Sequence, residues 1–335
     1  MSRADNPIIA ITMAEAAGIG PEILLKALAQ RSIFDHCRPL IIGDRKILEL
    51  ANTEFKTNIE FQVISDVNEA VWNSGQVNLI DLNDIPLDAF VIGKPNAVTG
   101  RSMIKQAELA VNLFLGGNIQ GAVGGPHSKK AAMDAGYNFI GYPVLIAEMT
   151  GEKYPFLMLV SGNLRVANVT LHISLRKALD LVTKTLVLEC IKAVNEAVKG
   201  FGIKQPKIAV AGLNPHAGEE RSFGDEDEDE IKPAVMAAQQ MGINALGPFP
   251  SDSLFYGCTD GKYDAYVAMY HDQAHLPVKV IAFKTTSAVA IGVRMNWATV
   301  DHGCALDIAW KGVADPGVLI ETVKLISSRA RIDEE

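Results

Sequence analysis

The amino-acid sequence predicts an α/β fold with mostly parallel sheets and flanking helices. Short, apolar, β-rich runs alternate with segments of helical spacing along the chain, which is the pattern of a doubly wound sheet. The chain has 335 residues, enough for two domains or for one large α/β unit with a sizeable core. Several apolar runs end abruptly in polar residues, as strands do where an open α/β sheet binds its ligand.

Composition excludes several classes of protein. The hydrophobic content of 48% and the charged content of 21% are those of an ordinary globular protein rather than a disordered one. The formal net charge of -8 and the lack of any Lys/Arg-rich run argue against a nucleic-acid partner. No apolar run reaches the length of a membrane span, and the start of the chain has no signal-peptide pattern. The 4 cysteines are scattered without paired spacing, which favours a reduced, cytoplasmic protein.

In the first part of the chain, the expected strands cover residues 8–12, 39–43, 61–64, 77–82 and 121–125. After the first strand, Gly18 and Gly20 allow a tight turn, and Pro21 suits the start of a helix that ends near residue 29. Such a turn can present backbone N–H groups to an anion, but the full dinucleotide fingerprint is missing, so a plain strand-to-helix turn is favoured. Another helix is expected at 46–52, and Thr99 is the expected N-cap of a long helix that ends at Gly116.

In the second part, the expected strands cover residues 156–160, 164–172, 207–212 and 265–268. Helical spacing is found at 174–199 and at 231–241. The acidic run at 225–230 precedes the second of these helices, and we interpret it as charge that complements the helix dipole rather than as a metal site.

Three histidines, His172, His216 and His271, each follow a separate apolar strand. Because the ends of parallel strands lie at one edge of a sheet, side chains from distant parts of the chain can converge there. Three neutral imidazoles with an open coordination position suit a catalytic divalent ion such as zinc. For any one of them taken alone, a hydrogen-bonded structural histidine is the commoner interpretation. Asp252 and Lys279 are candidates for the general base and for an anion contact or proton donor.

A second signal is the run from Asp301 to Gly312, which reads Asp-His-Gly-Cys-Ala-Leu-Asp-Ile-Ala-Trp-Lys-Gly. It resembles the His-Gly-Ser-Ala-Pro-Asp-Ile-Ala-Gly-Lys-Gly stretch of β-decarboxylating dehydrogenases of the isopropylmalate and isocitrate type, which wraps the adenosine of the nicotinamide cofactor. Trp310 replaces a small residue of that stretch and is expected to reshape the cofactor pocket. The resemblance implies cofactor contacts from Gly303, Ala305, Asp307 and Ile308.

A wider resemblance rests on four motifs in a fixed order. They are Gly18-Ile19-Gly20-Pro21-Glu22, Asn214-Pro215-His216-Ala217-Gly218-Glu219, Tyr270-His271-Asp272-Gln273 and Asp301-His302-Gly303. Together they resemble the 4-hydroxythreonine-4-phosphate dehydrogenase family, and the similarity extends from the first strand to the terminal helix.

This resemblance implies a two-domain isocitrate/isopropylmalate dehydrogenase-like fold with the active site in the interdomain cleft. The implied domains are a cofactor-side domain, residues 1–127 plus 285–335, and a metal, substrate and dimerisation domain, residues 128–284. The family also implies a homodimer whose active site is shared between subunits. The implied metal ligands are His172, His216 and His271, with Asp252 and Lys279 as the active-site Asp and Lys. The implied cofactors are NAD or NADP and a divalent metal, zinc first, with magnesium, manganese and cobalt as alternatives.

The chain departs from the family where the family holds phosphate. The family motif Gly-His-Thr-Glu is replaced by Gly141-Tyr142-Pro143-Val144, and an Asn and an Arg of the family fall at Ala288 and Trp297. Loss of the guanidinium and the amide removes most of a bidentate anion clamp. The sequence therefore predicts the family chemistry on a substrate without that phosphate.

One branch of the family, the dehydrogenases that act on the cis-dihydrodiol of terephthalate, resembles the chain around these departures. Arg294 then becomes a candidate partner for a substrate carboxylate, with a solvated surface arginine as the equal alternative. Tyr142, Pro143 and Trp297 are candidate contacts to a planar ring, although the aromatic side chains also suit the filling of core volume.

The sequence thus predicts a metal-dependent, NAD(P)-linked dehydrogenase that oxidises a secondary alcohol β to a carboxylate, with decarboxylation. The expected substrate is a small, non-phosphorylated hydroxy-carboxylate of the terephthalate cis-dihydrodiol type. The alternative is 4-hydroxythreonine-4-phosphate dehydrogenase of vitamin B6 biosynthesis, or a dehydrogenase of a 4-phospho-sugar acid. A non-catalytic relative that senses a metal or ligand is a third interpretation, disfavoured by the three histidines and the adenosine-type run.

Overall fold

The computed structural model describes residues 6–72 and 76–332, and the chain divides into two compact units. Unit 1 comprises Met1–Thr150 and Met295–Glu335, and unit 2 comprises Gly151–Arg294. The α/β class with mostly parallel strands is confirmed. The units are bounded differently from the expected domains. Residues 128–150, expected in the second domain, lie in unit 1, where their two helices pack against a long helix, and residues 285–294, expected in the first domain, lie in unit 2. The roles assigned to the two domains stay predictions.

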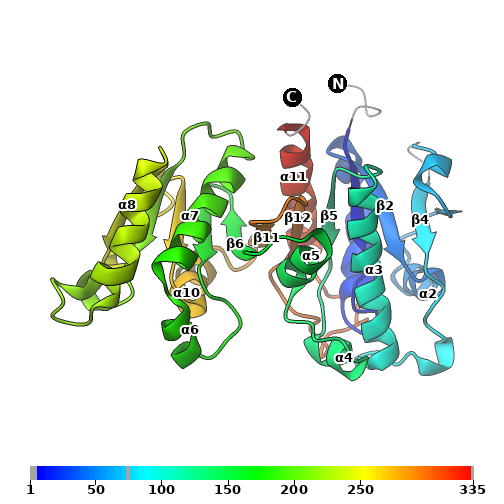
Figure 1. The fold of residues 1–335 in the computed structure, drawn as a ribbon. Helices are drawn as coiled ribbons and strands as arrows, with labels where there is room; N and C mark the ends of the chain where they lie inside the picture. The colour runs from blue at the N-terminus through cyan, green and yellow to red at the C-terminus, as the bar shows by residue number, and fades with distance from the viewer. Residues whose placement is uncertain (1–5, 73–75, 333–335) are drawn as a thin grey trace. The chain divides into compact units, whose positions relative to one another are not determined.

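Unit 1 contains a sheet of parallel strands in the order β3-β4-β2-β1-β5-β12. The strands are β1 Ile8–Thr12, β2 Arg38–Gly43, β3 Phe61–Ile64, β4 Val77–Asp81, β5 Gly121–Gly124 and β12 Trp297–Val300. The α-helices are α1 Gly20–Ala29, α2 Arg45–Phe55, α3 Ala97–Leu115, α4 Lys129–Asp134, α5 Tyr142–Thr150 and α11 Gly317–Ile332. Central strands β1 and β5 are almost wholly buried, as expected for apolar strands covered by helices, with α3 and α11 packed against both (Figure 1).

Unit 2 contains strands in the order β11-β6-β7-β10-β8-β9. β11, β6 and β7 pair antiparallel, whereas β7, β10, β8 and β9 run parallel. The strands are β6 Phe156–Ser161, β7 Leu164–Asn168, β8 Lys207–Ala211, β9 Asn244–Phe249, β10 Ala265–Ala268 and β11 Ser287–Ile291. The α-helices are α6 Leu175–Leu181, α7 Lys184–Lys199, α8 Lys232–Gln240, α9 Ser251–Leu254 and α10 His271–Ala282. Helix α7 packs against most of these strands, and α8 packs against α7 and β9 (Figure 1).

Two sequence predictions of helix boundaries were wrong. The single helix expected at 174–199 is two helices, because the Thr183 hydroxyl accepts a hydrogen bond from the Leu186 N–H and starts α7 anew. The N-cap of α3 is Asn96 rather than Thr99. Thr99 is the partner in a capping box, in which the Asn96 side chain accepts from the Thr99 N–H and the Thr99 hydroxyl accepts from the Asn96 N–H.

The 4 cysteines are all free and buried, as the scattered spacing indicated. Among the described residues, the helices are too short or too polar for any to cross a membrane.

A buried carboxyl group lies in unit 1 just after β1. The Glu15 side chain is fully buried, and its Oε1 accepts a hydrogen bond from the Ala17 N–H at 3.1 Å. Its Oε2 has no hydrogen-bond partner among the described residues. Burial raises the pKa of Glu15 to about 7, and this effect outweighs the hydrogen bonds from the Ala17 N–H and the Thr99 hydroxyl, which lower the pKa. Nearby Cys304 and Tyr142 are also buried, and burial and the Glu15 charge raise the pKa of both.

We predict that Glu15→Gln removes a pH dependence of stability. Because the folded pKa is raised from 4.5 to about 7, the folded chain holds this proton more tightly than the unfolded chain between those values. The free energy of unfolding of the wild type should therefore fall as pH rises through this window, by roughly 3 kcal/mol in total, and level off above it. A glutamine side chain cannot ionise, so the variant should lack this fall.

Urea unfolding followed at several pH values measures the difference. Glu49→Gln, at an exposed position of α2, is the control for the loss of one carboxylate. Equal pH slopes for the wild type and Glu15→Gln would show that Glu15 is not the group responsible.

Candidate active site

Four predicted site residues follow the carboxyl ends of neighbouring parallel strands in unit 2. His172 follows β7, His271 follows β10, His216 follows β8 and Asp252 follows β9. Since parallel strands end at the same edge of a sheet, the fold delivers all four residues to one edge.

Two of the histidines lie on one cavity. The His172 and His271 ring centroids are 5.7 Å apart, and both residues line a cavity of about 440 Å³. Tyr270 and Asp272 also line the cavity, and Ser174 together with apolar residues of the segment 171–178 forms the rest of the lining. The cavity is large enough for a small metabolite and combines an apolar lining with a few polar groups, as ligand sites do.

The His271 ring is oriented by its neighbour. Its Nδ1 lies 2.6 Å from Asp272 Oδ1, which leaves Nε2 as the nitrogen for a ligand. A carboxylate on one imidazole nitrogen is the usual support of a metal-binding histidine, because it fixes the ring and its tautomer. The His275 ring stacks on His271 at 3.7 Å with an interplanar angle of 9° and completes its support.

Helix α10 places further polar groups on the face that carries His271. His275 and Lys279 follow at intervals of four residues, so the three side chains lie along one stripe of the helix. The Lys279 Nζ is 5.1 Å from the centroid of the Phe283 ring, a cation–π distance. His275 is a residue that the sequence analysis did not assign to the site, and its spacing of four from His271 was the available signal.

His216 is held by a strained turn. The turn Pro215–Gly218 has φ of 53° at His216 and 55° at Ala217, values that non-glycine residues rarely adopt. The His216 ring packs against Phe223 at 6.0 Å. The described residues of a single chain contain no group of three metal-binding side chains, so one chain brings together His172 and His271 but not His216 with them.

The turn is anchored by Asp227, which the sequence analysis placed in a dipole-complementing acidic run. Asp227 is fully buried, and its carboxylate accepts from the Leu213 N–H at 2.8 Å and from the Asn214 N–H at 3.0 Å. It also accepts from the Asn214 side-chain amide at 3.0 Å. Asp227 begins a π-helical turn, Asp227–Ile231, that leads into α8, so this carboxylate ties the His216 turn to a helix.

The chemistry of this edge fits a divalent ion held by imidazoles. Two histidines share a cavity wall, and a carboxylate supports one of them. Asp252 lies in α9, which packs against the His216 turn. The assignment of these residues and of Lys279 to metal binding and catalysis stays a prediction.

In unit 1, the predicted cofactor run is fastened to the glycine turn between β1 and α1. The Ile19 N–H donates to the Cys304 carbonyl at 3.0 Å, and a Cβ at Gly18 would come within 2.8 Å of the Cys304 Cβ. The glycine turn is therefore filled by the chain itself, which supports the plain strand-to-helix interpretation. Ala305, one of the predicted cofactor contacts, adopts φ of 43°. The predicted contacts Gly303 and Asp307 are exposed, and Ile308 is half-buried.

Trp310 anchors the same run. Its ring packs between Phe55 and Phe90, with centroid distances of 5.8 and 5.4 Å, and its Nε1 donates to the Ala16 carbonyl at 3.2 Å. Its effect is thus to lock the run against the glycine turn.

The predicted substrate contacts Tyr142, Pro143 and Trp297 are buried within unit 1. The Tyr142 and Trp297 rings are 5.0 Å apart, and the two residues are 1% and 0% exposed. This is the core-filling alternative of the sequence analysis, and contact with a substrate stays a prediction. Arg294, in unit 2, is 62% exposed and its Nε donates to Glu152 at 2.7 Å.

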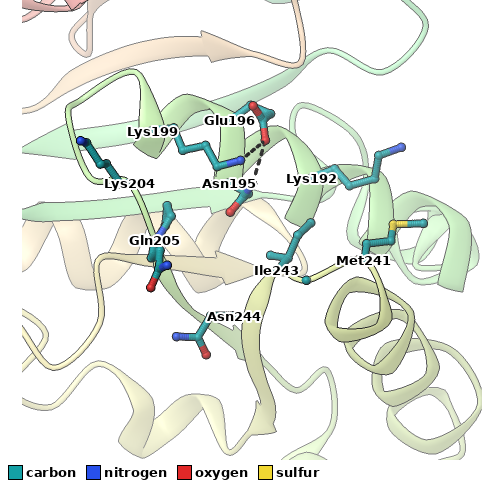
Figure 2. Close-up of a pocket in the computed structure, with 11 residues that line it drawn as sticks. Lys192, Asn195, Glu196, Lys199, Lys204, Gln205, Met241, Ile243 and Asn244 are labelled. Atoms are coloured by element: carbon teal, nitrogen blue, oxygen red, sulfur yellow. Dashed lines mark hydrogen bonds and ion pairs between the residues drawn. The ribbon is translucent and has the colours of Figure 1, made fainter.

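A second cavity of about 560 Å³ in unit 2 lies before the amino ends of β8 and β9 (Figure 2). Its polar lining includes Asn195, Lys199 and Gln205, and Lys199 and Asn195 both donate to Glu196. It is at the opposite end of these strands from His216 and Asp252 and holds no histidine, so the histidine-lined cavity is the candidate active site.

We predict that Asp227→Asn loosens the His216 turn. The amide would place a donor against at least one backbone N–H, so the free energy of unfolding should fall by about 1–3 kcal/mol. Urea unfolding measures this, and hydrogen exchange at Leu213 and Asn214 should quicken. Asp225→Asn is the control, because Asp225 is 68% exposed and pairs with Arg221 at the surface. Unchanged exchange at these two amides in Asp227→Asn would contradict the anchoring role.

Comparison with known proteins places this architecture among dehydrogenases. The chain is 40% identical over 319 residues to a D-threonate 4-phosphate dehydrogenase of Cupriavidus necator, covering 95% of this chain and 96% of the relative. A crystal structure of a 4-hydroxythreonine-4-phosphate dehydrogenase from Burkholderia phymatum is similar with a TM-score of 0.84 and 39% identity, covering 97% and 98% of the two chains. A terephthalate 1,2-cis-dihydrodiol dehydrogenase from Burkholderia xenovorans is similar with a TM-score of 0.67 and 29% identity, covering 96% and 98%.

The profile of one protein family, the pyridoxal phosphate biosynthetic protein PdxA, matches residues 35–326. With this match and relatives of 36–40% identity over nearly their whole length, the chain belongs to the PdxA family.

Proposed function

We propose that the chain is a metal-dependent, NAD(P)-linked dehydrogenase that oxidises the secondary alcohol of a small phosphorylated hydroxy acid. The proposed substrates are of the D-threonate 4-phosphate or 4-hydroxythreonine 4-phosphate class. The observation that carries the proposal is the cavity lined by His172 and His271 in a chain that is 40% identical, over 95% of its length, to a D-threonate 4-phosphate dehydrogenase. The non-phosphorylated substrate favoured by the sequence analysis becomes the second candidate.

His172 and His271 would hold a divalent ion, which would supply a Lewis acid for the substrate hydroxyl. Bound NAD(P) would supply the hydride acceptor. Oxidation at the carbon β to a carboxylate gives a β-keto acid, which is the chemical requirement for loss of CO₂.

The side chains of unit 2 supply binding and proton handling. Asp272 and His275 hold the His271 ring in one orientation, so that Nε2 is presented without rearrangement. Lys279, half-buried on the same stripe of α10, is the proposed anion contact or proton donor. Asp252, on the short helix against the His216 turn, is the proposed general base.

We further propose that a second copy of the chain completes the site. Helix α10 and its C-cap expose large apolar side chains beside the polar stripe, namely Leu276 at 64%, Val280 at 85% and the C-cap Phe283 at 68%. Soluble monomers rarely leave such a cluster in water, and the family resemblance implies a homodimer with a shared active site. A partner packed on this face would lie next to His271 and Lys279, which supports a site built from two chains.

The second candidate is a non-phosphorylated cis-dihydrodiol carboxylate. The observation that favours it is the buried ring pair of Tyr142 and Trp297, at two positions where the family holds phosphate. Neither Tyr142 Oη nor Trp297 Nε1 carries a positive charge, so this pair cannot neutralise a phosphate dianion. The similarity to the Burkholderia xenovorans enzyme adds support.

One assay decides between the candidates. NADH and NADPH formation is followed with D-threonate 4-phosphate, 4-hydroxythreonine 4-phosphate and the terephthalate cis-dihydrodiol, each with and without EDTA. We expect chelator-sensitive turnover of a phosphorylated substrate and at least a 100-fold lower rate, on the order of 3 kcal/mol, for His172→Ala and His271→Ala. His36→Ala, in unit 1, is the control.

Turnover of the dihydrodiol alone would overturn the phosphorylated substrate in favour of the second candidate. Turnover that survives EDTA and both histidine substitutions would overturn the metal assignment.

We predict that Val280→Asp together with Phe283→Ser separates the proposed dimer. A charged and a polar side chain on this apolar surface reduce the free energy gained when it is buried against a partner. The sedimentation coefficient should therefore change from that of a dimer to that of a monomer. Met133→Asp, at a 66% exposed position of unit 1, is the control and should leave the sedimentation unchanged. A wild-type chain that sediments as a monomer at all concentrations would refute the dimer.

A further inference from the structure

A chain of hydrogen bonds crosses the strand ends that carry the candidate site. The Thr170 N–H and hydroxyl both donate to the Met269 carbonyl, at 3.1 and 2.8 Å, and join the end of β7 to the end of β10. The Gly212 N–H donates to the Phe249 carbonyl at 2.8 Å and joins β8 to β9. The gap between these two pairs is closed by one side chain.

That side chain is Gln273, which is 8% exposed in the first turn of α10. Its Oε1 accepts from the Met269 N–H at 2.6 Å, and its Nε2 donates to the Gly212 carbonyl at 2.8 Å. Only one orientation of the amide satisfies both contacts, because Met269 offers a donor and Gly212 an acceptor.

Helix capping explains only half of this arrangement. A Gln at the third position of a helix commonly reaches back to a backbone N–H before the helix, as Gln273 does to Met269. The bond to Gly212 is not of this kind, since Gly212 lies 61 residues earlier in the chain, at the end of β8. It is made to the backbone immediately before the turn that carries His216.

We propose that Gln273 is a positioning residue that sets the His216-bearing end of β8 against the His271-bearing end of β10. Gly212 precedes the backbone groups held by Asp227, so Gln273 and Asp227 fix the root of the His216 turn from two sides. Asp227 holds the N–H groups of Leu213 and Asn214, and Gln273 holds the carbonyl of Gly212. The proposal deepens the proposed function, because its consequence for metal binding rests on the histidine assignment.

The two hydrogen bonds of Gln273, to the Met269 N–H and to the Gly212 carbonyl, are called the clamp below. Two substitutions test these hydrogen bonds separately. Gln273→Glu keeps an acceptor for the Met269 N–H but puts a carboxylate oxygen against the Gly212 carbonyl. Gln273→Met, which keeps a side chain of similar size, loses both hydrogen bonds. Gln239→Glu is the matched control, since Gln239 Nε2 also donates to a backbone carbonyl of unit 2, that of Ala245 at 2.8 Å, away from the histidines.

Hydrogen exchange of the full chain, measured without metal, reports directly on the hydrogen bonds of the clamp. The Met269 amide should exchange faster in Gln273→Met but keep its protection in Gln273→Glu. Exchange at Leu213 and Asn214 should quicken in both variants and stay unchanged in Gln239→Glu. Wild-type exchange at all these amides in Gln273→Met would overturn the clamp.

Zinc affinity, measured by competition with a chromophoric chelator, reads the positioning. Both position-273 variants should bind Zn²⁺ about 10–100-fold more weakly than the wild type, while Gln239→Glu binds as the wild type does. Wild-type affinity in both variants, or an equal loss in Gln239→Glu, would overturn the positioning role. Failure of the proposed function is distinct, because the wild type itself would then bind no Zn²⁺ although its exchange pattern showed the clamp.

Discussion

The hydrogen-bonded chain across the strand ends of unit 2 is the constraint on which the candidate site depends. Strands β7, β10, β8 and β9 end side by side, and the backbone groups just beyond them must find partners because they are buried. These groups form successive hydrogen bonds that link Thr170, Met269, Gln273, Gly212 and Phe249. The segments that follow these strand ends carry the three predicted histidines and Asp252. Hydrogen bonds therefore fix the backbone from which these side chains extend, although the segments themselves are exposed or half-buried.

Unit 1 uses the same device at the predicted cofactor run. The run is joined to the glycine turn through the Cys304 carbonyl and through Trp310. Fully buried Glu22 accepts from the Gly312 and Ala314 N–H groups, so α1 holds the end of the run as well. In both units, a side chain on the first turns of a helix fastens a loop that is distant in sequence. Loops that bind ligands are precise only when a rigid scaffold holds them in this way.

Membership of the PdxA family and the departures from it have to be considered together. Relatives at 36–40% identity include D-threonate 4-phosphate dehydrogenases, and this similarity supports the proposed phosphorylated substrate. The buried ring pair of Tyr142 and Trp297 lies where the family resemblance implies phosphate contacts, and it supports the second proposed substrate. A Cβ at Gly124 would touch both rings, so the pair fits against β5 as part of the unit 1 core. A phosphate bound by this chain therefore needs donors other than these two residues.

The sequence by itself determined the α/β class, most of the strands, the family, and the strands after which the histidines lie. These features are local, since hydrophobic periodicity and short motifs are properties of neighbouring residues. The tertiary structure decided which polar side chains fasten the turns: Gln273 reaches Gly212 across 61 residues, and Asp227 reaches Leu213 from what reads as an ordinary acidic run. It also decided that Tyr142 and Trp297 meet. Such contacts join residues that are distant in sequence and become neighbours only in the folded chain. The spacing of residues in one sequence does not show which of them will meet.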